Sequence, residues 1–542
     1  MTTPPLLYFG DNLHILREHI ADETVDLIYL DPPFNSKRDY NLLFKTPKGQ
    51  QADASITAFE DTWHWGEQAE REYGELLRQP NTDVAELMSS LRRFLKESDV
   101  MAYLVMMANR LLELHRVLKE TGSLYLHCDP TASHYLKIIL DTVFGNLFFQ
   151  NEIVWKRTSA KGLTTKRLPS NHDIIFHYSK TEQFTWNSHA VFKAYDEDNL
   201  DEKTANKYTH RDPDGRLYRL DSLINPNPNR PNLTYEFLGI TRVWRWTRER
   251  MQKAYEAGLV VQTKPGTVPQ GKRYLDEQRG KPISDVWADI SPLNSQATER
   301  LGYPTQKPLA LLERIIQASS NPEDLVLDPF CGCGTAVHAA QKLGRNWIGI
   351  DITHLSIHLI ERRMHEAFPD LKFGIHGEPE DLASARDLAE RDKYEFQFWA
   401  CSLVGAQPYK GGQKGADSGI DGILYFQDDK KEAKKIIVSV KGGEHVTRTQ
   451  IADLKNTVER EGAEMGFFIT LAEPTDPMVK EAVSAGFYQS QIMGDFPKIQ
   501  ILTIEQLLGG AEPRYPDLTM GQASFKKAKT EKKKADQPGL FT

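Results

Sequence analysis

The fold is decided by residues 325–335, which read Leu325-Val326-Leu327-Asp328-Pro329-Phe330-Cys331-Gly332-Cys333-Gly334-Thr335. The first three residues are a short apolar run typical of a buried parallel strand, and Pro329 prevents its continuation. The two glycines let the backbone of the turn approach a ligand closely, and residues 335–340 are a good start for a helix. A strand, a glycine turn and a helix in this order predict part of a Rossmann-like α/β sheet.

A following strand supports this prediction. Residues 347–351 read Trp347-Ile348-Gly349-Ile350-Asp351, so a second carboxylate stands 23 residues after Asp328. In dinucleotide-type folds an acid about 20 residues beyond the glycine turn binds a ribose hydroxyl. The turn lacks the Gly-Lys-Ser/Thr sequence that grips phosphates, so it is not a phosphate loop.

A second strand end, about 300 residues earlier, carries the chemistry. Residues 25–30 form a mostly apolar strand, and it is followed by Asp31-Pro32-Pro33-Phe34. The prolines stop the strand, stiffen the turn and remove two backbone donors, which leaves carbonyl groups as acceptors. A carboxylate, a carbonyl and a flat ring at a carboxyl strand end suit a planar base that bears an exocyclic amine.

At these residues the chain resembles the β class of DNA amino-methyltransferases, in which a D/N/S-P-P-F/Y/W motif comes first and the cofactor motif last. Pro304-Thr305-Gln306-Lys307-Pro308 matches the segment that precedes the cofactor loop in that family. The resemblance implies S-adenosylmethionine as the cofactor and a catalytic set of Asp31, Pro32, Pro33 and Phe34. It implies a cofactor site made of Asp11, Asn12, Thr305, Lys307, Asp328, Phe330, Cys331, Gly332, Gly334, Thr335 and Asp351.

Two of these assignments leave local alternatives open. The turn at Asp11 and Asn12 precedes a helical stretch and could cap it, which is compatible with a contact to the adenine of the cofactor. His127 and Asp129 follow a predicted strand and look like a metal pair in isolation. The resemblance favours a scaffold role for them, and no metal is expected at the methyltransferase site.

The reaction that the resemblance implies is methylation of adenine N6 in double-stranded DNA. Asp before Pro-Pro is commoner in the adenine group of the family, and cytosine N4 methylation is the alternative. A non-enzymatic rival, a DNA-binding protein with an inactive methyltransferase fold, is disfavoured by the intact Asp31, Gly332 and Gly334.

Length and composition bound the rest of the chain. With 542 residues it should hold two or three domains, and its net charge of −8 gives no overall basic signal. No apolar run reaches 18 residues, so a cytoplasmic enzyme is expected. We expect a methyltransferase domain from residues 1–150 and 295–368, a target-recognition region at 151–294, a linker at 369–387, an endonuclease-like domain at 388–510 and a basic tail at 511–542.

Basic and aromatic residues interleave in the middle region. Arg-Val-Trp-Arg-Trp-Thr-Arg at 242–248 is the densest example. Cations can bind phosphates and planar rings can stack on bases, so this region is expected to contact DNA through Lys156, Arg157, Arg242, Arg245 and Arg248. Residues 40–100 are predicted to form an insertion, either an exposed helical hairpin or a surface for dimerisation or DNA contact.

The C-terminal region resembles the Mrr-like branch of the restriction endonuclease fold. Asp421 and Lys441 match the family's Asp and Lys. Ser439 stands where the family has Glu or Gln, and Gln397 stands where the family has a Glu on the preceding helix. Carboxylates would hold Mg²⁺ for phosphodiester cleavage, with Glu395 or Asp417 as substitute ligands. Cleavage by Asp421, Ser439 and Lys441, a DNA-binding remnant, and an unrelated α/β domain remain open.

The last residues carry two further signals. A basic run at 526–534 is expected to be disordered and to attract DNA phosphates. The chain ends in Gln537-Pro538-Gly539-Leu540-Phe541-Thr542. Gln-x-x-Leu-Phe resembles the peptide by which bacterial proteins dock on the replication sliding clamp, and a plain solubilising tail is the alternative.

Overall fold

The computed structural model of this protein describes residues 5–33, 39–45, 51–60, 64–158, 168–294, 297, 299–301, 303, 305–409, 419–426, 434–490, 493–516 and 531. The chain divides into two compact units: Met1–Trp186 with Asp285–Thr542, and Asn187–Ser284. Among the described residues, no helix is long and apolar enough to cross a membrane.

The first unit is built on a large, mostly parallel sheet. Strand β7 is antiparallel to both of its neighbours, and the other pairings are parallel. In the described residues the order is β16 (Val286–Trp287), β6 (Phe149–Trp155), β7 (Asp173–Ser179), β5 (Leu118–Cys128), β2 (Val25–Leu30), β17 (Leu325–Asp328), β18 (Asn346–Asp351), β1 (Leu6–Phe9) and β19 (Gly374–His376). The central strands are buried, as expected of a parallel sheet covered on both faces.

The strands that carry the two motifs are neighbours. Val326 of β17 pairs with Leu27 of β2, and Leu327 pairs with Ile28, although about 300 residues separate them in sequence. Because parallel strands end at the same edge, Asp31 and Asp328 lie at one rim of the sheet, the position where α/β folds bind ligands. The expected meeting of the two strand ends is therefore confirmed.

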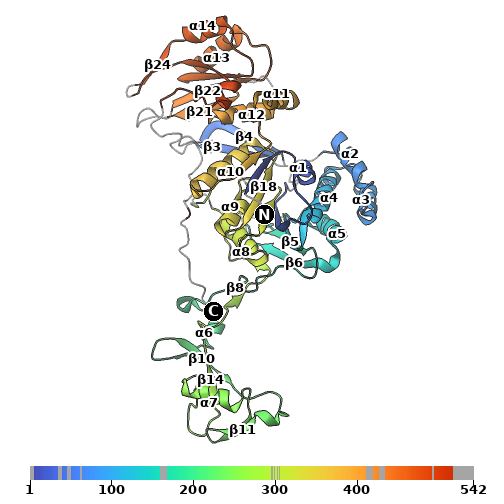
Figure 1. Cartoon of the computed structure of the whole chain (residues 1–542), viewed down its shortest axis with the longest axis vertical. Helices are drawn as coiled ribbons and strands as arrows, with labels where there is room; N and C mark the ends of the chain where they lie inside the picture. The colour runs from blue at the N-terminus through green and yellow to red at the C-terminus, as the bar shows by residue number, and fades with distance from the viewer. Residues whose placement is uncertain are drawn as a thin grey trace. The chain divides into compact units, whose positions relative to one another are not determined.

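Helices cover both faces of this sheet. Figure 1 shows one group on one side of β18 and a second group on the other. The first group is α8 (Leu309–Ser319), α9 (Thr335–Lys342) and α10 (His354–Ala367), and the second is α1 (Asn12–His19), α4 (Asp99–Val117) and α5 (Ser133–Phe144). Most residues of α4 are buried, because it packs between the sheet and further helices. The fold is the doubly wound α/β class that the sequence predicts.

The predicted insertion at 40–100 contains a ribbon and a helical pair. The ribbon is β3 (Asp39–Lys45) with β4 (Gln51–Glu60), and the helices are α2 (Glu67–Leu76) and α3 (Thr82–Leu95). Leu76, Val84 and Met88 are completely buried, and they belong to the same hydrophobic core as α4. The helical pair is thus docked on the main hydrophobic core of the first unit.

The second unit, Asn187–Ser284, is shorter than the region expected at 151–294, because residues 149–155 and 173–179 are strands of the main sheet. It contains a small sheet, a hairpin and helix α7 (Arg248–Glu256) around Trp244. The small sheet is β13 (Val260–Val261), β14 (Gln270–Tyr274), β10 (Leu217–Ser222) and β9 (His210–Arg211), and the hairpin is β11 (Thr234–Phe237) with β12 (Ile240–Val243).

The C-terminal domain has a separate sheet and its own core. The strand order is β20 (Gln407–Pro408), β21 (Gly422–Phe426), β22 (Lys434–Lys441), β23 (Met465–Thr470) and β26 (Ile499–Thr503). The domain begins with two helices, α11 (Leu382–Arg391) and α12 (Lys393–Leu403), and the Asp392 side chain between them caps the second helix. Helices α13 (Arg448–Arg460) and α14 (Asp476–Ser484) follow.

Candidate active site

The carboxylate after β2 is bound on one side only. Lys307, from the segment before α8, donates from Nζ to Oδ2 of Asp31. The Asp31 and Lys307 side chains are 17% and 11% exposed, so the pair lies mostly out of solvent. Oδ1 of Asp31 is buried and accepts no hydrogen bond from the described residues. Asp31 is therefore anchored through one oxygen and able to accept a hydrogen bond from a ligand through the other.

The glycine turn lies beside this carboxylate. Gly332 and Gly334 have φ angles of +52° and +72°, in the left-handed region that favours glycine. A Cβ atom at residue 334 would lie 2.8 Å from Cγ1 of Ile360. The N–H of Gly332 donates to Oδ2 of Asp351 at 2.8 Å, so the turn is tied to the end of β18. The turn is therefore held close to a second carboxylate at the same rim.

Burial raises the pKa of two acids at this rim, Asp328 and Asp351. Burial raises the pKa of Asp328 well above its usual range, and the neighbouring charges of Asp31 and Asp351 raise it further. Burial also raises the pKa of Asp351, although the N–H groups of Thr353 and Gly332 oppose this effect. Three acids lie near two cations here, Lys307 and the buried Arg363 behind the turn, so the excess of acids suits a cationic ligand group.

The predicted contacts at the start of α1 are already engaged within the protein. Asp11 caps the helix through Leu13 N at 2.8 Å and accepts from Arg110 at 2.9 Å. Asn12 accepts from Nε of Arg110 and donates to Pro329 O at 2.7 Å. The cap that local sequence indicates is therefore present, and Asn12 also fastens α1 to the turn after β17. A contact to a cofactor adenine stays a prediction.

Other residues of the predicted cofactor set form hydrogen bonds or packing contacts that hold the glycine turn in place. Cys331 is buried and donates its N–H to Ile350 O at 3.0 Å, while Phe330 packs against the main core. Thr335 accepts from Arg363 of α10 at 3.2 Å, and Arg363 also donates to Cys333 O at 2.8 Å. Thr335 therefore supports the turn from behind. Thr305 is partly buried and makes no side-chain hydrogen bond with another described residue, so its role stays a prediction.

A buried polar network lies next to the catalytic strand. Both ring nitrogens of His127 form hydrogen bonds: Nδ1 lies 3.0 Å from Tyr29 Oη, and Nε2 lies 3.2 Å from Oδ2 of Asp173. Although burial opposes ionisation, the hydrogen bond and charge of His127 lower the pKa of Asp173. Arg157 reaches the other oxygen of Asp173 at 3.1 Å. The predicted DNA contact at Arg157 thus has a structural partner, while its side chain is still 40% exposed.

Asp129 does not converge with His127. Its Oδ1 accepts from Thr131 N at 3.0 Å and Ala132 N at 3.2 Å, which caps the turn before α5. Within the described residues, no group of three or more His, Cys, Asp and Glu side chains could hold a metal ion.

The segment of alternating Arg and Trp at 242–248 is only partly exposed to solvent. Arg242, Arg245 and Arg248 are exposed, and each donates to a backbone carbonyl. Trp244 is completely buried, and its Nε1 donates to Tyr235 O at 2.8 Å. The expectation that this tryptophan stacks on bases is wrong, because it forms the core of the small unit. Lys156 is exposed at the end of β6.

The predicted endonuclease residues come together in the C-terminal domain. Asp421 precedes β21, and its Oδ2 accepts from Val440 N at 2.7 Å and from Ser439 Oγ at 3.4 Å. Nζ of Lys441 lies 3.8 Å from the same oxygen. Glu395 is mostly buried, which raises its pKa to about 7, with the Asp392 charge adding to the effect. Among the described residues, neither Glu395 nor Gln397 forms a hydrogen bond or ion pair with this cluster, and Asp417 lies outside the described residues.

Comparison with known proteins identifies the larger domain. Residues 25–362 match the family model described as DNA methylase, which is more than half of the chain. The chain belongs to the DNA methylase family. Residues 388–500 of this methylase match a second family model, described as restriction endonuclease.

Named relatives of the methylase include a type II methyltransferase and a subunit of a type III restriction-modification enzyme. The type II methyltransferase M.EcaI of Enterobacter cloacae is 33% identical over 46% of this chain and 54% of its own length. The type III StyLTI Mod subunit of Salmonella typhimurium is 26% identical over 62% of this chain and 50% of its own length. The chain thus spans about half the length of these relatives. The solved PvuII DNA methyltransferase (cytosine-N4-specific) is 15% identical over 66% of this chain and 86% of that chain, with a TM-score of 0.33.

The sequence analysis did not predict some polar residues that support the site of the methylase. Some residues that it did predict lie outside the described part of the chain. Arg110, Arg363 and Asp173 were missed, because a buried polar residue inside an apolar run has no local signature of its partner. The only available signal was the presence of such polar residues in otherwise apolar elements. Phe34, the clamp-like peptide at 537–541 and nearly all of the basic run lie outside the described residues.

Proposed function

We propose that this protein transfers a methyl group from S-adenosylmethionine to the exocyclic amine of adenine, N6, in double-stranded DNA. One observation carries the proposal: Asp31 is anchored by Lys307 through Oδ2, while its buried Oδ1 has no hydrogen-bond partner among the described residues. An acceptor held in this way suits an amine donor that arrives with the substrate. Membership of the DNA methylase family supplies the substrate class.

Asp31 and Pro32 would act together on the amine. The exocyclic nitrogen is a poor nucleophile because its lone pair is delocalised into the ring. If Oδ1 of Asp31 and the carbonyl of Pro32 accept its two hydrogens, the nitrogen can become pyramidal and direct its lone pair at the donor. Such orientation can contribute several kcal/mol, roughly up to the ~7–11 kcal/mol reached by ideal intramolecular reactions. Phe34 would stack on the base, which must leave the duplex to be reached.

S-adenosylmethionine, when bound, supplies an electrophilic methyl group on a sulfonium centre. The residues present fit this cofactor, because three acids, Asp31, Asp328 and Asp351, lie around a glycine turn and outnumber the cations beside it, Lys307 and Arg363. Asp351 would hold the ribose and Asp11 the adenine. The turn from Phe330 to Thr335 would accommodate the methionine part.

The choice of adenine rests on the aspartate before Pro-Pro. The same geometry of a carboxylate and a carbonyl could grip N4 of cytosine, which is the alternative. The exposed side chains of Lys156, Arg242, Arg245 and Arg248 would bind DNA phosphates. Docking on a sliding clamp through residues 537–541, and formation of a homodimer, are further proposals that rest on sequence alone.

The test compares wild type with Asp31→Ala and Asp31→Asn. We expect both variants to lose methylation of DNA by at least roughly 100-fold while cofactor affinity, measured by calorimetry, changes little. Modification-sensitive sequencing of DNA from expressing cells would identify the base and its sequence context. Loss of cofactor binding in Asp31→Asn would instead assign this residue to the cofactor site and overturn the mechanism.

A second candidate activity, Mg²⁺-dependent cleavage of DNA, is favoured by the cluster of Asp421, Ser439 and Lys441. Asp421 would bind the ion, and Lys441 would lie near the attacking water. The test is nicking of supercoiled DNA with Mg²⁺, which should disappear in Lys441→Ala and in excess chelator. Methylation should survive both treatments, because no step of methyl transfer proposed for Asp31 requires a metal. Nicking that persists in Lys441→Ala would exclude this centre.

A further inference from the structure

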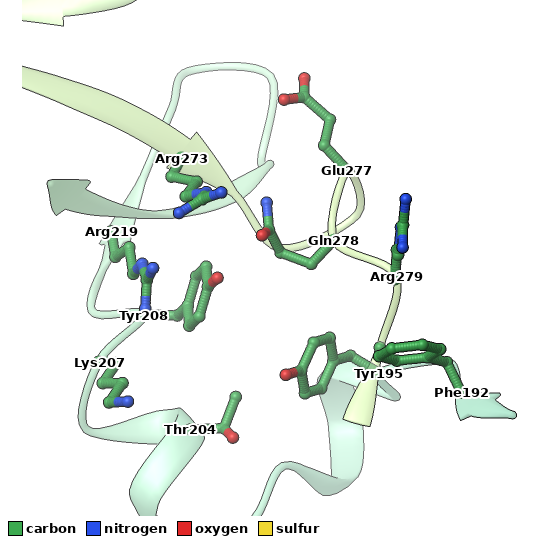
Figure 2. Close-up of a pocket in the computed structure, with 11 residues that line it drawn as sticks. Phe192, Tyr195, Thr204, Lys207, Tyr208, Arg219, Arg273, Glu277, Gln278 and Arg279 are labelled. Carbon is green, nitrogen blue, oxygen red and sulfur yellow. The ribbon is translucent and has the colours of Figure 1, made fainter. Parts of the chain in front are cut away.

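The small unit contains a pocket that none of the predicted DNA contacts touches. Its volume is about 620 Å³, within the range of pockets that hold small ligands. It lies between β8 (Phe192–Lys193), helix α6 (Glu202–Ala205) with the residues that follow it, strands β10 and β14, and the turn after β14 (Figure 2). Arg242, Arg245 and Arg248 do not line it.

Aromatic rings form part of the pocket wall. Tyr208 packs in a small cluster with Leu217 and Leu275, and Tyr195 lies against the same cluster. Figure 2 shows Tyr208 and Tyr195 on either side of the cavity, with Phe192 beyond Tyr195. Burial raises the pKa of Tyr208, so its ring stays neutral at physiological pH. Fixed aromatic faces beside an open volume suit a planar ligand group.

Cations outnumber acids in the lining. Four lining side chains are cationic, and Glu277 is the only acid among them. Glu277 is itself paired with Arg216 at 2.8 Å. The lining cations are Lys207, Arg219, Arg273 and Arg279.

These cations differ in how they are balanced. Arg219 and Arg273 share Asp221, at 3.0 and 3.2 Å. Lys207 and Arg279 form no ion pair with any described residue, and both are exposed. Two uncompensated cations therefore remain to bind an anion at this pocket.

We propose that this pocket binds one unpaired nucleotide of the DNA on which the protein acts, a different nucleotide from the target base that Asp31 and Phe34 would hold. The phosphate would be bound by Lys207 and Arg279, and the base would stack on Tyr195, whose ring is only partly buried, beside the wall that the buried Tyr208 forms. Paired bases have both faces covered by their neighbours in the stack, so this arrangement selects a nucleotide that has left the duplex. A site for duplex phosphates alone would need the cations and would gain nothing from the rings. The inference rests on the proposed function, which supplies DNA as the ligand.

The test uses the full chain and a fluorescein-labelled single-stranded oligonucleotide, compared with the same sequence as a duplex and with a free mononucleotide. Binding is followed by anisotropy at fixed salt. We expect Lys207→Ala combined with Arg279→Ala to weaken single-strand binding by roughly tenfold, and Tyr195→Ala to do the same. Duplex binding should change less than about twofold in Tyr195→Ala, because stacking on a ring needs an open base face. Tyr195→Phe should retain binding.

A matched control separates the pocket from general loss of charge. Lys253→Ala combined with Lys264→Ala removes two exposed lysines of the same unit that do not line the pocket. This pair should leave the preference for single strands unchanged. Equal losses in the control and the pocket variants, unchanged single-strand binding in Tyr195→Ala, or equal weakening of duplex in Tyr195→Ala would overturn the proposal. Tight binding of the free mononucleotide, unaffected by the attached strand, would assign the pocket to a small ligand and overturn it also.

Failure of this inference is distinguishable from failure of the proposed function. If wild type methylates DNA and the pocket variants bind single strands normally, only the inference fails. If wild type does not methylate DNA, the proposed function fails whatever the pocket binds. The melting temperature of each variant, measured by circular dichroism, identifies changes that come from unfolding.

Discussion

Lys307 holds Oδ2 of Asp31 and leaves Oδ1 of the same carboxylate without a hydrogen-bond partner among the described residues. The two residues are 276 positions apart in the chain. Lys307 was expected to border the cofactor, and its observed contact is with the predicted catalytic acid. The lysine is therefore well placed to orient the carboxylate and to offset part of its charge.

Lys307→Ala should lower the rate of methylation while most of the protein stays folded. Removal of the ammonium leaves a mostly buried carboxylate without its partner, so Asp31 should lose its fixed orientation. We expect the single-turnover rate to fall by at least roughly tenfold. Lys307→Arg keeps the charge and should recover part of the rate. Equal rates for wild type and Lys307→Ala would show that the pair has no role in the reaction.

Gly334→Ala should impair both stability and cofactor binding. The substitution places a Cβ atom 2.8 Å from Ile360 at a φ angle of +72°. Gly344 has the same φ angle and nothing within 4 Å of a Cβ atom, so Gly344→Ala is a matched control for backbone strain alone. The control should cost about 1–2 kcal/mol of unfolding free energy.

The clash at residue 334 should add about 1–3 kcal/mol to that cost. Urea denaturation measures the difference between the two variants, and titration with S-adenosylmethionine measures its effect on binding. Equal unfolding free energies for Gly334→Ala and Gly344→Ala would mean that α10, which carries Ile360, moves away from the added methyl group without penalty.

Asp328→Asn should make the protein less sensitive to high pH. Burial raises the pKa of Asp328 well above 3.8, so the folded protein keeps this proton after the unfolded chain has lost it. Since the folded state then binds more protons, stability is lost as the pH rises from about 4 through the raised pKa. Asparagine carries no charge, and its side-chain oxygen can still accept from Phe330 N.

The measurement is the melting temperature of both proteins without cofactor between about pH 5 and about pH 8. The melting temperature of wild type should fall more than that of Asp328→Asn over this interval, because only wild type gives up the retained proton. Parallel curves for the two proteins would show that the Asp328 proton is not retained on folding.

Trp244→Ala and Arg245→Ala should separate folding from DNA binding. Trp244 is completely buried in the core of the small unit, so its truncation should cost about 3–5 kcal/mol and expose that unit to proteolysis. Arg245 is exposed, and Arg245→Ala should leave stability nearly unchanged.

The effect of Arg245→Ala should appear in DNA affinity. If this side chain binds a phosphate, the slope of log affinity against log salt should fall in magnitude by about 1. An unchanged slope would exclude a phosphate contact. If Arg245→Ala is cleaved by protease as readily as Trp244→Ala, Arg245 has a structural role.

The sequence by itself determined the fold class and the location of both motifs. A short apolar run followed by Asp-Pro-Pro or by Asp-Pro-Phe and glycines can be recognised locally, because prolines end strands and glycines permit positive φ angles. The placement of Asp31 and Asp328 at one rim also followed from sequence, since carboxyl ends of parallel strands meet there.

Tertiary structure decided which partners the polar residues have. The contacts of Lys307 with Asp31, of Arg110 with Asp11 and Asn12, and of His127 with Asp173 join distant segments, and no local pattern specifies such pairs. Tertiary packing also placed Trp244 inside its unit while the neighbouring arginines stayed outside. The physical reason is that a local sequence fixes backbone preference and amphipathic pattern, whereas burial and pairing depend on which elements the whole chain brings together.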